Sequence, residues 1–401
     1  MTDIPFEDAQ GRILDHVGPL GAEAVPIHEA TGRVLAGEIA APFDMPAADN
    51  SAMDGFAVRS AECRTTVDLK VTGYRPAGFS EETPVFPGCA VRIMTGAPLP
   101  GGYDTVVPLE DAREEDGTVR IRGPVRAGAH VRVRGEDVKA GDLVIRPGAV
   151  LRPPEISLIA SMGRVQIPVF RKPNVAILAT GDELVEPGEK ILPGAVVNSN
   201  SFSLASAVRE AGAEPAILGI AGDSLPDLRE KLSAGLSEDV LITSAGVSVG
   251  DRDLVREALS GLGVREIFWR VRMRPGRPFA FGLSGAVPVF SLPGNPVSAL
   301  ITFEMLVRPA LRAMVGDPAP VKPRVKGVLE EPIRKKAGRI QFLRVRMELR
   351  DGTWQVRSAG DQNTGILRTL VHGNGIALLP ADRTEFQPGE TVELLPLYTR
   401  C

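Results

Sequence analysis

Between residues 174 and 310 the chain alternates short aliphatic runs with amphipathic runs of helical period. Glycine, proline or polar turns bound each aliphatic run. This alternation predicts a mainly parallel, doubly wound sheet, because parallel strands need crossover connections that helices supply. Ligands bind to such sheets at the carboxyl ends of the strands. The pattern therefore indicates both a fold class and the edge where a site should lie.

The remaining sequence predicts further parts, since 401 residues exceed one ordinary core. Apolar residues at helical spacing over residues 5–40 predict a helical N-terminal part, and residues 141–173 contain another short helix that could rejoin it. Between these segments, and again near the end, glycine and proline punctuate brief β-like runs. We predict four domains: a helical or linker domain of residues 1–44 plus 141–173, an inserted β-rich domain of 45–140, an α/β domain of 174–320, and a small C-terminal β-barrel of 321–401.

Composition narrows the class of protein. The formal net charge of −4 gives no reason to expect a nucleic-acid partner, and no apolar run is long enough to span a membrane. The three cysteines are widely spaced without a CxxC pair, so neither a disulfide framework nor a zinc site is indicated. The N-terminus shows no secretion signal. We expect a cytoplasmic enzyme.

Acidic side chains follow three strands of the predicted α/β sheet. The acids nearest these strand ends are Asp182, Glu183, Asp223, Asp251 and Asp253. Any one of them could simply cap a helix. Together, beside a glycine loop of the kind that binds phosphate, they favour a divalent cation such as magnesium, which prefers oxygen ligands and bridges to phosphates.

Three arginines, Arg272, Arg274 and Arg277, bracket a Pro-Gly turn at another strand end. Guanidinium groups suit tetrahedral oxyanions, although a solvated basic loop would look the same. Asn295 and Pro296 predict the start of a helix whose backbone donors could hold a second anion. Polar clusters in the β-rich region could be no more than turn chemistry. Recognisable nucleophile, zinc and dinucleotide motifs are absent from the sequence, so positioning and charge neutralisation would carry the chemistry.

Eight segments in order resemble the MoeA family of molybdopterin molybdenumtransferases, which includes the E domain of gephyrin. They are DNSAMDGFAV, RIMTGAPLP, RGEDVKAGD, LATGDEL, NSNS, TSAGVSVGDRD, RPGRPFAFG and SLPGNPVSA. The resemblance covers essentially the whole chain, and the joint occurrence of the motifs is far more specific than any one of them.

The resemblance implies a reaction and its partners. Members insert molybdate into adenylylated molybdopterin and release AMP with a divalent cation, usually Mg²⁺. They form homodimers whose active site lies between the α/β domain of one subunit and the inserted domain of the other. Molybdopterin adenylyltransferase and downstream cofactor-handling proteins would be further partners. The alternatives are a non-catalytic molybdopterin-binding scaffold and the adenylyltransferase itself.

The resemblance also implies site residues. The expected catalytic residues are Asp54, Thr95, Asp137, Glu183, Asp223 and Asp253, of which Glu183, Asp223 and Asp253 would hold the metal. The expected substrate-binding residues are Arg132, Gly246, Ser248, Arg274, Arg277, Pro293, Gly294, Asn295, Arg344 and Thr364.

Two departures from the family pattern involve three residues. Arg274 and Arg277 stand where lysines are usual, and a planar guanidinium differs from a compact ammonium at a tight oxyanion pocket. Ala245 stands where glycine is common, which matters if the backbone there has a positive φ. Both departures bear on rate and oxyanion affinity more than on the type of reaction.

Overall fold

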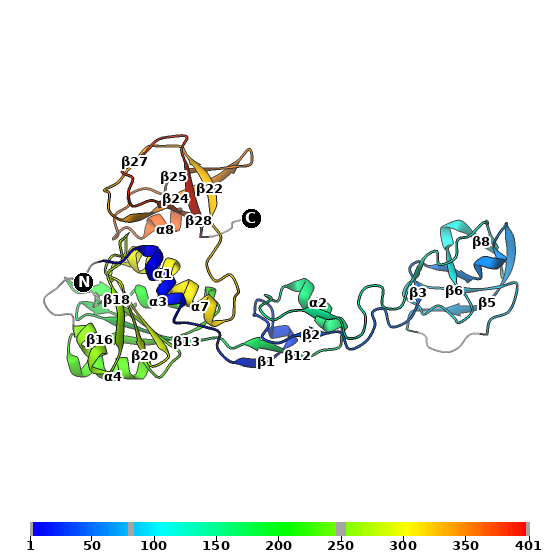
Figure 1. Ribbon diagram of the computed structural model, residues 1–401, viewed down its shortest axis with the longest axis horizontal. Helices are drawn as coiled ribbons and strands as arrows, with labels where there is room; N and C mark the ends of the chain where they lie inside the picture. Colours follow the sequence, from blue (N-terminus) through cyan, green and yellow to red (C-terminus); the bar gives the residue numbers. More distant parts are fainter. Residues whose placement is uncertain (1–2, 79–83, 246–253, 398–401) are drawn as a thin grey trace. The chain divides into compact units, whose positions relative to one another are not determined.

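The computed structural model describes residues 3–78, 84–245 and 254–397. The chain forms two compact units (Figure 1). The first consists of Met1–Ala36, Gly148–Arg152 and Gln166–Cys401, and the second of Gly37–Pro147 and Pro153–Val165. Within the described residues, none of the helices has the length and apolarity needed to cross a membrane.

The α/β part of the first unit is built on a sheet with the strand order β16-β13-β17-β21-β20-β18. Its strands are β13 (Asn174–Thr180), β16 (Glu214–Ala221), β17 (Val240–Ser244), β18 (Arg265–Trp269), β20 (Ala280–Ser284) and β21 (Val287–Leu292). Strands β16, β13, β17 and β21 run parallel, whereas β20 and β18 continue the sheet in antiparallel pairing. The expected parallel sheet is therefore a mixed sheet with an antiparallel edge.

Helices cover both faces of this sheet, as the alternation predicted. Along β13, Val175 and Ile177 enter one core while Ala176 and Leu178 enter another, because successive side chains of a strand point to opposite faces. The helices of this part are α1 (Phe6–Leu14), α3 (Asn200–Glu210), α4 (Leu225–Gly235), α5 (Leu254–Gly261), α6 (Pro296–Thr302), the π-helical turn η4 (Phe303–Val307) and α7 (Arg308–Met314). The buried apolar side chains of α4 and α5 share one core, and the buried apolar side chains of α1, α3, α6, η4 and α7 share the other.

The N-terminal segment is less helical than expected. The helix α1 ends at Leu14, and the chain continues through β1 (Ala22–Pro26), η1 (Ile27–Glu29) and β2 (Ile39–Ala40). Apolar residues at helical spacing therefore predicted the type of element correctly only for the first turns, because the glycines and prolines that follow stop the helix. Strand β1 pairs with β12 (Gln166–Phe170), so segments far apart in sequence lie side by side here.

The C-terminal residues of the first unit form a closed barrel. Its strands are β22 (Val325–Leu329), β24 (Ile340–Arg350), β25 (Thr353–Ser358), β26 (Gly375–Leu379) and β28 (Thr391–Pro396). The order β24-β25-β22-β28-β26 closes through a pairing of β26 with β24. The short strand β19 (Met273–Arg274), which comes from the α/β part, pairs in parallel with Ile340 and Gln341 of β24. The barrel also carries β23 (Ile333–Arg334), β27 (Glu385–Phe386) and α8 (Arg368–His372).

The second unit contains a β-rich domain with the sheet order β7-β4-β6-β5-β9-β8. From residue 50 onward, the elements of the second unit are β3 (Asn50–Ser51), β4 (Gly55–Val58), η2 (Ser60–Glu62), β5 (Val67–Arg75), β6 (Cys89–Ile93), β7 (Thr105–Pro108), η3 (Leu109–Asp111), β8 (Ala112–Glu115), β9 (Thr118–Ile121), β10 (Val131–Arg132), β11 (Leu143–Ile145) and α2 (Pro153–Ser161). Strand β10 pairs with β3, and β11 pairs with β2.

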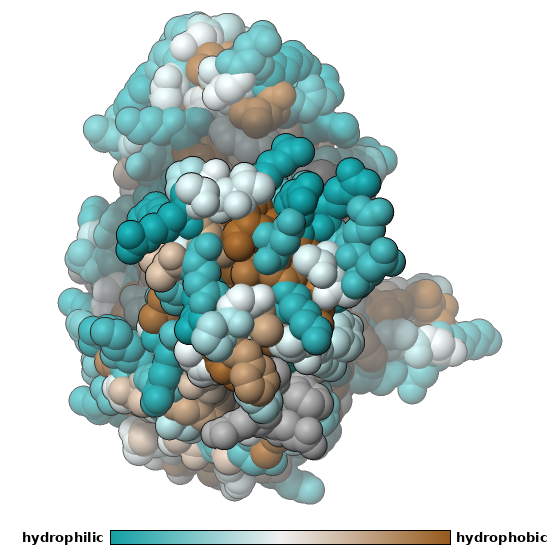
Figure 2. Space-filling model, turned by 90° about the vertical axis from the view of Figure 1, so that its right-hand side faces the viewer, coloured by the Kyte–Doolittle hydropathy of each residue, from teal (hydrophilic) through white to brown (hydrophobic). Residues whose placement is uncertain are grey.

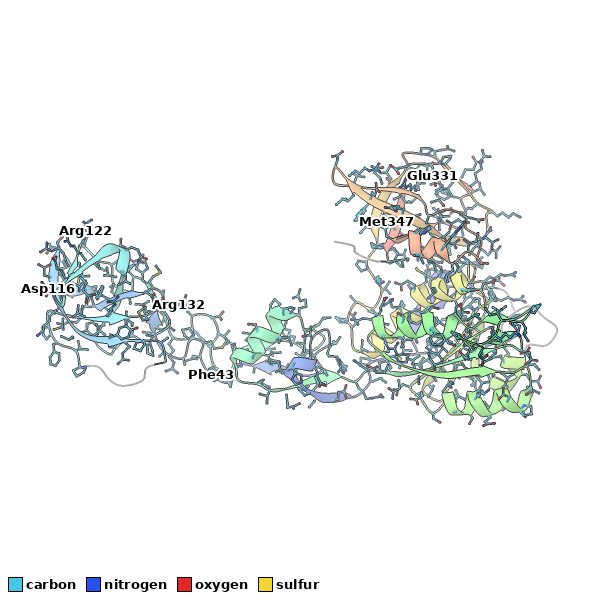
Figure 3. The ribbon with its side chains drawn as sticks, turned by 180° about the vertical axis from the view of Figure 1, so that it is seen from behind. Phe43, Asp116, Arg122, Arg132, Glu331 and Met347 are labelled. Carbon is cyan, nitrogen blue, oxygen red and sulfur yellow. The ribbon has the colours of Figure 1, made fainter. Side chains whose placement is uncertain are left out.

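Two views show the ends of this domain. In Figure 2 the end nearest the viewer has apolar side chains at its centre with hydrophilic side chains around them. In Figure 3 Asp116, in the turn between β8 and β9, lies at one end of the domain, and Arg132 of β10 lies at the other. Arg132 is therefore remote from the β8–β9 turn and close to the segments that leave the domain.

Candidate active site

A pocket of about 590 Å³ lies where the parallel strands of the first unit end. The loops after β13, β16, β17 and β21 contribute to it, as does the start of α3. Its lining residues are Ala179, Thr180, Gly181, Glu183, Leu184, Val196, Val197, Asn198, Ser199, Asn200, Asp223, Ser244, Ala245, Pro278, Pro293, Gly294, Asn295 and Pro296. The short parallel pair β14 (Leu184–Val185) and β15 (Val196–Val197) forms one wall. We call this the acidic pocket, because Glu183 and Asp223 are its charged residues.

Hydrogen bonds between the loops hold the floor of the acidic pocket together. The backbone N–H of Asp223 donates to Asp182 Oδ1 at 2.9 Å, which joins the loops after β13 and β16. The backbone N–H of Ala245 donates to the carbonyl of Leu292 at 3.1 Å, which joins the ends of β17 and β21. The strand ends therefore meet as one edge, as predicted from the alternation.

Asn200 is a site residue that sequence reasoning did not single out. It is the first residue of α3, and its Nδ2 donates to Ser244 Oγ and to the carbonyl of Gly294, both at 2.8 Å. One amide thus ties α3 to the loops after β17 and β21. The NSNS segment at a strand–helix junction was the available signal, but its partners lie 44 and 94 residues away in the chain.

The two carboxylates of the acidic pocket have no cationic partner among the described residues. Glu183 lies directly over Gly181, where an added Cβ would come within 2.5 Å of Glu183 Oε2. Asp223 does not cap α4, because Ser224 is the N-cap and its side chain accepts from the N–H of Asp227. The capping explanation is therefore wrong for Asp223, and both carboxylates are exposed and available to a ligand.

The acids fit a magnesium ion that also binds substrate and water. Mg²⁺ in proteins often takes only one or two carboxylates and completes its coordination with phosphates and water. The described residues hold no cluster of three or more His, Cys, Asp or Glu that could bind a metal by itself. The third expected ligand, Asp253, lies outside the described residues, as do Asp251, Gly246 and Ser248.

Three of the expected substrate-binding residues follow β21. Pro293, Gly294 and Asn295 all line the acidic pocket. Asn295 is the N-cap residue of α6 and Pro296 follows it at the start of the helix, yet the Asn295 side chain makes no capping hydrogen bond. The Asn295 amide therefore remains available to a ligand in the pocket.

A second pocket of about 410 Å³ lies between β19 and the barrel, and we call it the arginine pocket. It is lined by Arg274, Pro275, Gln341, Phe342, Arg344, Asp361, Gln362, Asn363 and Thr364. It brings together three residues expected to bind substrate: Arg274, Arg344 and Thr364. Residues 272–278 form a loop that we call the arginine loop. Its Pro275 lines this pocket and its Pro278 lines the acidic pocket, so the arginine loop borders both pockets.

Arg344 is the most buried charged residue of the arginine pocket, with 1% of its surface exposed. Burial lowers the pKa of its guanidinium, and the nearby Asp361 opposes this shift. Its Nη2 donates to the carbonyls of Asp361 at 3.0 Å and Asn363 at 3.2 Å. Nε is buried without a partner among the described residues. A buried guanidinium with unmet donors favours an anionic ligand.

Arg277 has a different environment from the one expected. It lines neither pocket, and its Nε donates to Asp3 Oδ2 at 2.6 Å. This hydrogen bond with Asp3 raises the pKa of Arg277 and lowers that of the aspartate. In the structure, therefore, Arg274 rather than Arg277 accompanies Arg344.

The remaining expected residues belong to the second unit. Asp54 Oδ1 accepts hydrogen bonds from the backbone N–H and the hydroxyl of Thr95, both at 2.7 Å. These bonds, the backbone one first, lower the pKa of the Asp54 carboxyl. Arg132 and Asp137 are exposed, and their side chains have no hydrogen-bond or ion-pair partner among the described residues. Both thus remain available for substrate.

Neighbouring acidic side chains of the second unit stabilise turns and loops by accepting hydrogen bonds from backbone N–H groups. Asp49 accepts from the N–H of Arg134, and Glu136 accepts from the N–H of Val133. Asp44 accepts from the N–H of Ala140 and from Arg134 Nε. The alternative explanation for this cluster is therefore right for these acids. Asp54 is likewise hydrogen-bonded, to Thr95, whereas the Asp137 side chain has no partner among the described residues.

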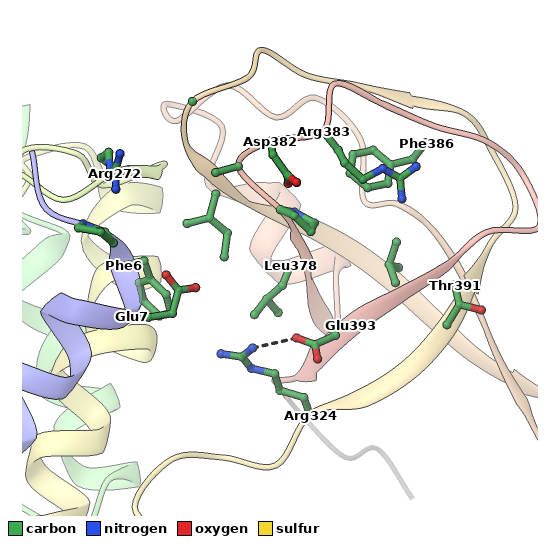
Figure 4. Close-up of a pocket in the computed structure, with 16 residues that line it drawn as sticks. Phe6, Glu7, Arg272, Arg324, Leu378, Asp382, Arg383, Phe386, Thr391 and Glu393 are labelled. Carbon is green, nitrogen blue, oxygen red and sulfur yellow. Dashed lines mark hydrogen bonds and ion pairs between the residues drawn. The ribbon is translucent and has the colours of Figure 1, made fainter.

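A further pocket, of about 620 Å³, lies between α1 and the barrel (Figure 4). Two of its arginines are engaged in ion pairs. Arg324 pairs with Glu393 at 2.8 Å, and Arg383 pairs with Glu390 at 2.6 Å while its guanidinium lies 4.3 Å from the ring centre of Phe386. Apart from Arg272, it contains none of the residues that the sequence singled out.

Comparison with known proteins agrees with this geometry. Residues 4–163 match the family model for the MoeA N-terminal region (domain I and II), and residues 326–397 match that for the MoeA C-terminal region (domain IV). Residues 176–313, which contain the acidic pocket, match the family model described as a probable molybdopterin binding domain. The chain belongs to the MoeA family.

Relatives in the MoeA family match nearly the whole chain. Molybdopterin molybdenumtransferase 2 of Mycobacterium tuberculosis is 37% identical over 384 residues, covering 93% of this chain and 94% of the relative. Molybdopterin molybdenumtransferase of Haemophilus influenzae is 35% identical over 400 residues, covering 98% of each. The crystal structure of a molybdopterin biosynthesis MoeA protein from Pyrococcus horikoshii superposes with a TM-score of 0.85 at 30% identity, covering 99% of this chain and 100% of that one.

Proposed function

We propose that this MoeA-family chain is a molybdopterin molybdenumtransferase that inserts molybdate into adenylylated molybdopterin and releases AMP. One observation carries the proposal. Two pockets of opposite charge lie on either side of the arginine loop, one with Glu183 and Asp223 and the other with Arg274 and Arg344. A reaction that joins an oxyanion to a phosphate-bearing organic substrate needs both kinds of site.

The acidic pocket would receive the pyrophosphate of the substrate. Among the described residues, its lining has two carboxylates and no basic side chain, so these residues would repel a bare diphosphate. Magnesium between the carboxylates and the phosphates removes this repulsion. Glu183 and Asp223 would hold the ion, together with Asp253. When bound, Mg²⁺ stabilises the charge that develops as the pyrophosphate link breaks.

The protein's own groups would orient the rest of the substrate. Asn200 fixes the relative positions of the loops after β17 and β21, and the Asn295 amide is available to bind the ligand. Gly246 and Ser248 would complete the phosphate-binding loop. Such positioning lowers the entropic part of the barrier without any covalent step on the protein.

The arginine pocket would receive molybdate. Arg274 and Arg344 supply positive charge and planar donors, and Thr364 adds a hydroxyl at the same wall. Arg344 is almost fully buried, so water could not take over its role as a hydrogen-bond donor to the oxyanion. Arg277 would join the oxyanion only by leaving Asp3.

The site would be completed across a homodimer, with Asp54, Thr95, Arg132 and Asp137 of one subunit facing the acidic pocket of the other. The support is chemical. Arg132 and Asp137 are exposed polar side chains without partners in the part of the chain that the structure describes, and the pKa of the Asp54 carboxyl lies below its usual value. Molybdopterin adenylyltransferase, which would make the substrate, and cofactor-handling proteins, which would take the product, are proposed as further partners.

The deciding experiment measures AMP release from adenylylated molybdopterin with molybdate and Mg²⁺. Wild type should release AMP, and EDTA should stop the release until Mg²⁺ is restored. Glu183→Gln should lower kcat/KM by about 10²-fold, because the metal loses a charged ligand. Glu230→Gln, on the exposed side of α4, is the matched control and should be silent.

Other outcomes would point elsewhere. Substrate binding without AMP release in wild type would favour a scaffold, and ATP consumption with unmodified molybdopterin would favour an adenylyltransferase. Release of AMP that is indifferent to EDTA would contradict the role given to Glu183 and Asp223.

A further inference from the structure

We propose that Gln362 is the positioning residue of the arginine pocket and sets the affinity of the protein for its oxyanion by holding Arg344 in place. This inference rests on the proposed function, in which the arginine pocket takes molybdate. Gln362 lines the pocket, but its side-chain amide is directed to the protein rather than to a ligand. Its role is visible only in the hydrogen bonds it makes.

The Gln362 amide binds both backbone groups of Arg344. Its Oε1 accepts from the Arg344 N–H at 3.0 Å, and its Nε2 donates to the Arg344 carbonyl at 3.1 Å. The register of β25 with β24 ends at Ser358, opposite Val345, and beyond it the Ala359 N–H still donates to the Arg344 carbonyl at 3.0 Å. Gln362 Oε1 therefore supplies the acceptor that a strand neighbour would otherwise offer to the Arg344 N–H.

The same amide fixes the loop that follows β25. Its Nε2 also lies 2.9 Å from the carbonyl of Gly360 and 3.1 Å from Ser358 Oγ, so its two hydrogens are shared among three acceptors. With these bonds the loop of residues 359–364 is closed on itself and on β24. No polar atom of Gln362 remains to bind a ligand, which distinguishes it from Arg344 and Thr364.

This loop supplies the acceptors that orient the Arg344 guanidinium. Nη2 of Arg344 donates to the carbonyls of Asp361 and Asn363, which flank Gln362 in the chain. Gln362 hydrogen-bonds to the backbone of Arg344, and it thereby positions the two carbonyls that accept hydrogen bonds from the Arg344 side chain. Thr364, the next residue of the loop, is set on the pocket wall by the same arrangement.

Burial makes this positioning consequential. The Arg344 side chain has almost no exposure, so it cannot recover lost hydrogen bonds from water. If the loop loosens, the guanidinium loses its fixed acceptors and its direction toward the pocket. Affinity for a tetrahedral oxyanion should fall, whereas the acidic pocket, built from other loops, should be unaffected.

The test compares Gln362→Met, which keeps the length of the side chain without its hydrogen bonds, with Gln362→Glu, which loses the donors and adds charge. Gln355→Glu, on β25 and outside the arginine pocket, is the matched control. Molybdate itself is the probe, titrated into the full-length protein by calorimetry. Steady-state AMP release then gives KM for molybdate and for adenylylated molybdopterin separately.

We expect both Gln362 variants to bind molybdate at least about tenfold more weakly than wild type, because several hydrogen bonds at a buried charge are lost. The KM for molybdate should rise by the same factor, and saturating molybdate should restore most of kcat. The KM for the pterin substrate should stay unchanged. Amide exchange of residues 359–364 should accelerate in both variants and not in the control.

Several outcomes would overturn the proposal. They are unchanged molybdate affinity in both variants, unchanged exchange of the loop, or an equal rise in both KM values, which would indicate a general structural defect. If Gln362→Glu does not fold, Gln362→Met decides alone. Wild-type protein that binds no molybdate would refute the oxyanion role of the pocket itself, and that failure is separate because it precedes any substitution.

Discussion

Ala245 is a residue with a Cβ atom at a position where the backbone has a conformation that favours glycine. It lies directly after β17, in the wall of the acidic pocket, with a φ of 78°. A Cβ atom is disfavoured in this left-handed region, whereas glycine adopts it readily. The sequence raised this question because glycine is common at the position in the family, and the structure answers it: the backbone does have a positive φ.

Replacing Ala245 with glycine should therefore stabilise the protein, by up to about 1 kcal/mol, because the strain is relieved. Calorimetric unfolding of the two proteins would measure the change. Ala207→Gly, in the middle of α3, makes the same substitution at helical φ and should instead destabilise by about 1 kcal/mol. A loss of stability in both variants would show that the strain at residue 245 is negligible.

Asp54 and Thr95 allow a second prediction for single residues, concerning pH. The two hydrogen bonds from Thr95 lower the pKa of Asp54 in the folded protein. A depressed carboxyl pKa contributes stability above the unfolded pKa, and this contribution is lost as the pH falls through the folded value. Thr95→Val removes the hydroxyl but keeps the backbone donor, so the pKa should rise only part of the way.

Carbon-detected NMR titration of the Asp54 carboxyl would follow this rise. Thr95→Ser retains the hydroxyl and should keep the low pKa of wild type. An identical titration midpoint in the valine variant would mean that the backbone donor alone sets the pKa.

Single residues were predictable from the sequence when their role follows from their place on an element. Glu183 and Asp223 could be placed because strand ends of a parallel sheet converge on one edge. Asn200 and Gln362 could not, since their roles depend on side-chain hydrogen bonds to partners that the local pattern does not reveal. The Asp3 partner of Arg277 is separated from it by 274 residues and was equally hidden.

Among the elements, the turn between β19 and β20 has a strict steric requirement. Gly276 has a φ of 99°, and a Cβ there would lie 2.2 Å from Thr302 Cγ2 at the end of α6. Thr302 is fully buried and its hydroxyl donates within α6, so it cannot easily move away. The turn therefore packs against the helix, and this contact fixes the course of the loop that carries Arg274.

Gly276→Ala should displace this turn and cost at least about 2 kcal/mol, since it combines a clash with the buried Thr302 side chain with an unfavourable φ. Molybdate affinity should fall more than substrate affinity, because the turn leads into the arginine pocket. Gly285→Ala offers a control, since it has a φ of 59° but open space around the added Cβ. Similar losses in both variants would show that φ, and not the contact with Thr302, is decisive.

Element types in the α/β part followed from periodicity because its strands and helices bury alternating or helical patterns of apolar residues. The same reasoning overextended α1, since Phe6, Ala9 and Ile13 bury one short helical face and the sequence beyond them returns to strands. The strands β18 and β20 were predictable, but their antiparallel pairing and the π-helical η4 left no clear pattern in the sequence. Pairing direction and helix register depend on contacts between elements, which local periodicity does not contain.

At the scale of the whole molecule, the two units divide the expected site residues between them. Glu183 and Asp223 belong to the first unit, and Asp54, Thr95, Arg132 and Asp137 to the second. The sequence suggested this division through the resemblance to a family, not through composition. Whether one subunit or two complete a site cannot be deduced from local patterns, and a functional experiment can decide it.

Mixing two inactive variants tests the proposed shared site. Asp54→Ala damages only the second unit and Glu183→Gln only the first, so a mixed dimer would retain one intact site. Activity after subunit exchange should recover to at most about a quarter of wild type, because half of the dimers are mixed and each has one good site of two. The readout is AMP release before and after exchange.

A mixture of Asp54→Ala with Arg132→Ala provides the control. Both changes lie in the second unit, so no mixed dimer would contain an intact site. Recovery in this control, or none in the first mixture, would contradict a site shared between subunits.

The two-residue strand β19 belongs to the α/β part by sequence yet hydrogen-bonds to the barrel. A shortened chain that stops before residue 325 would therefore keep its acids but lose one whole side of the anion-binding cleft. Such a fragment should still bind the pterin nucleotide but should no longer bind the molybdate that is to be inserted into it. Truncation would in this way separate ligand capture from metal delivery.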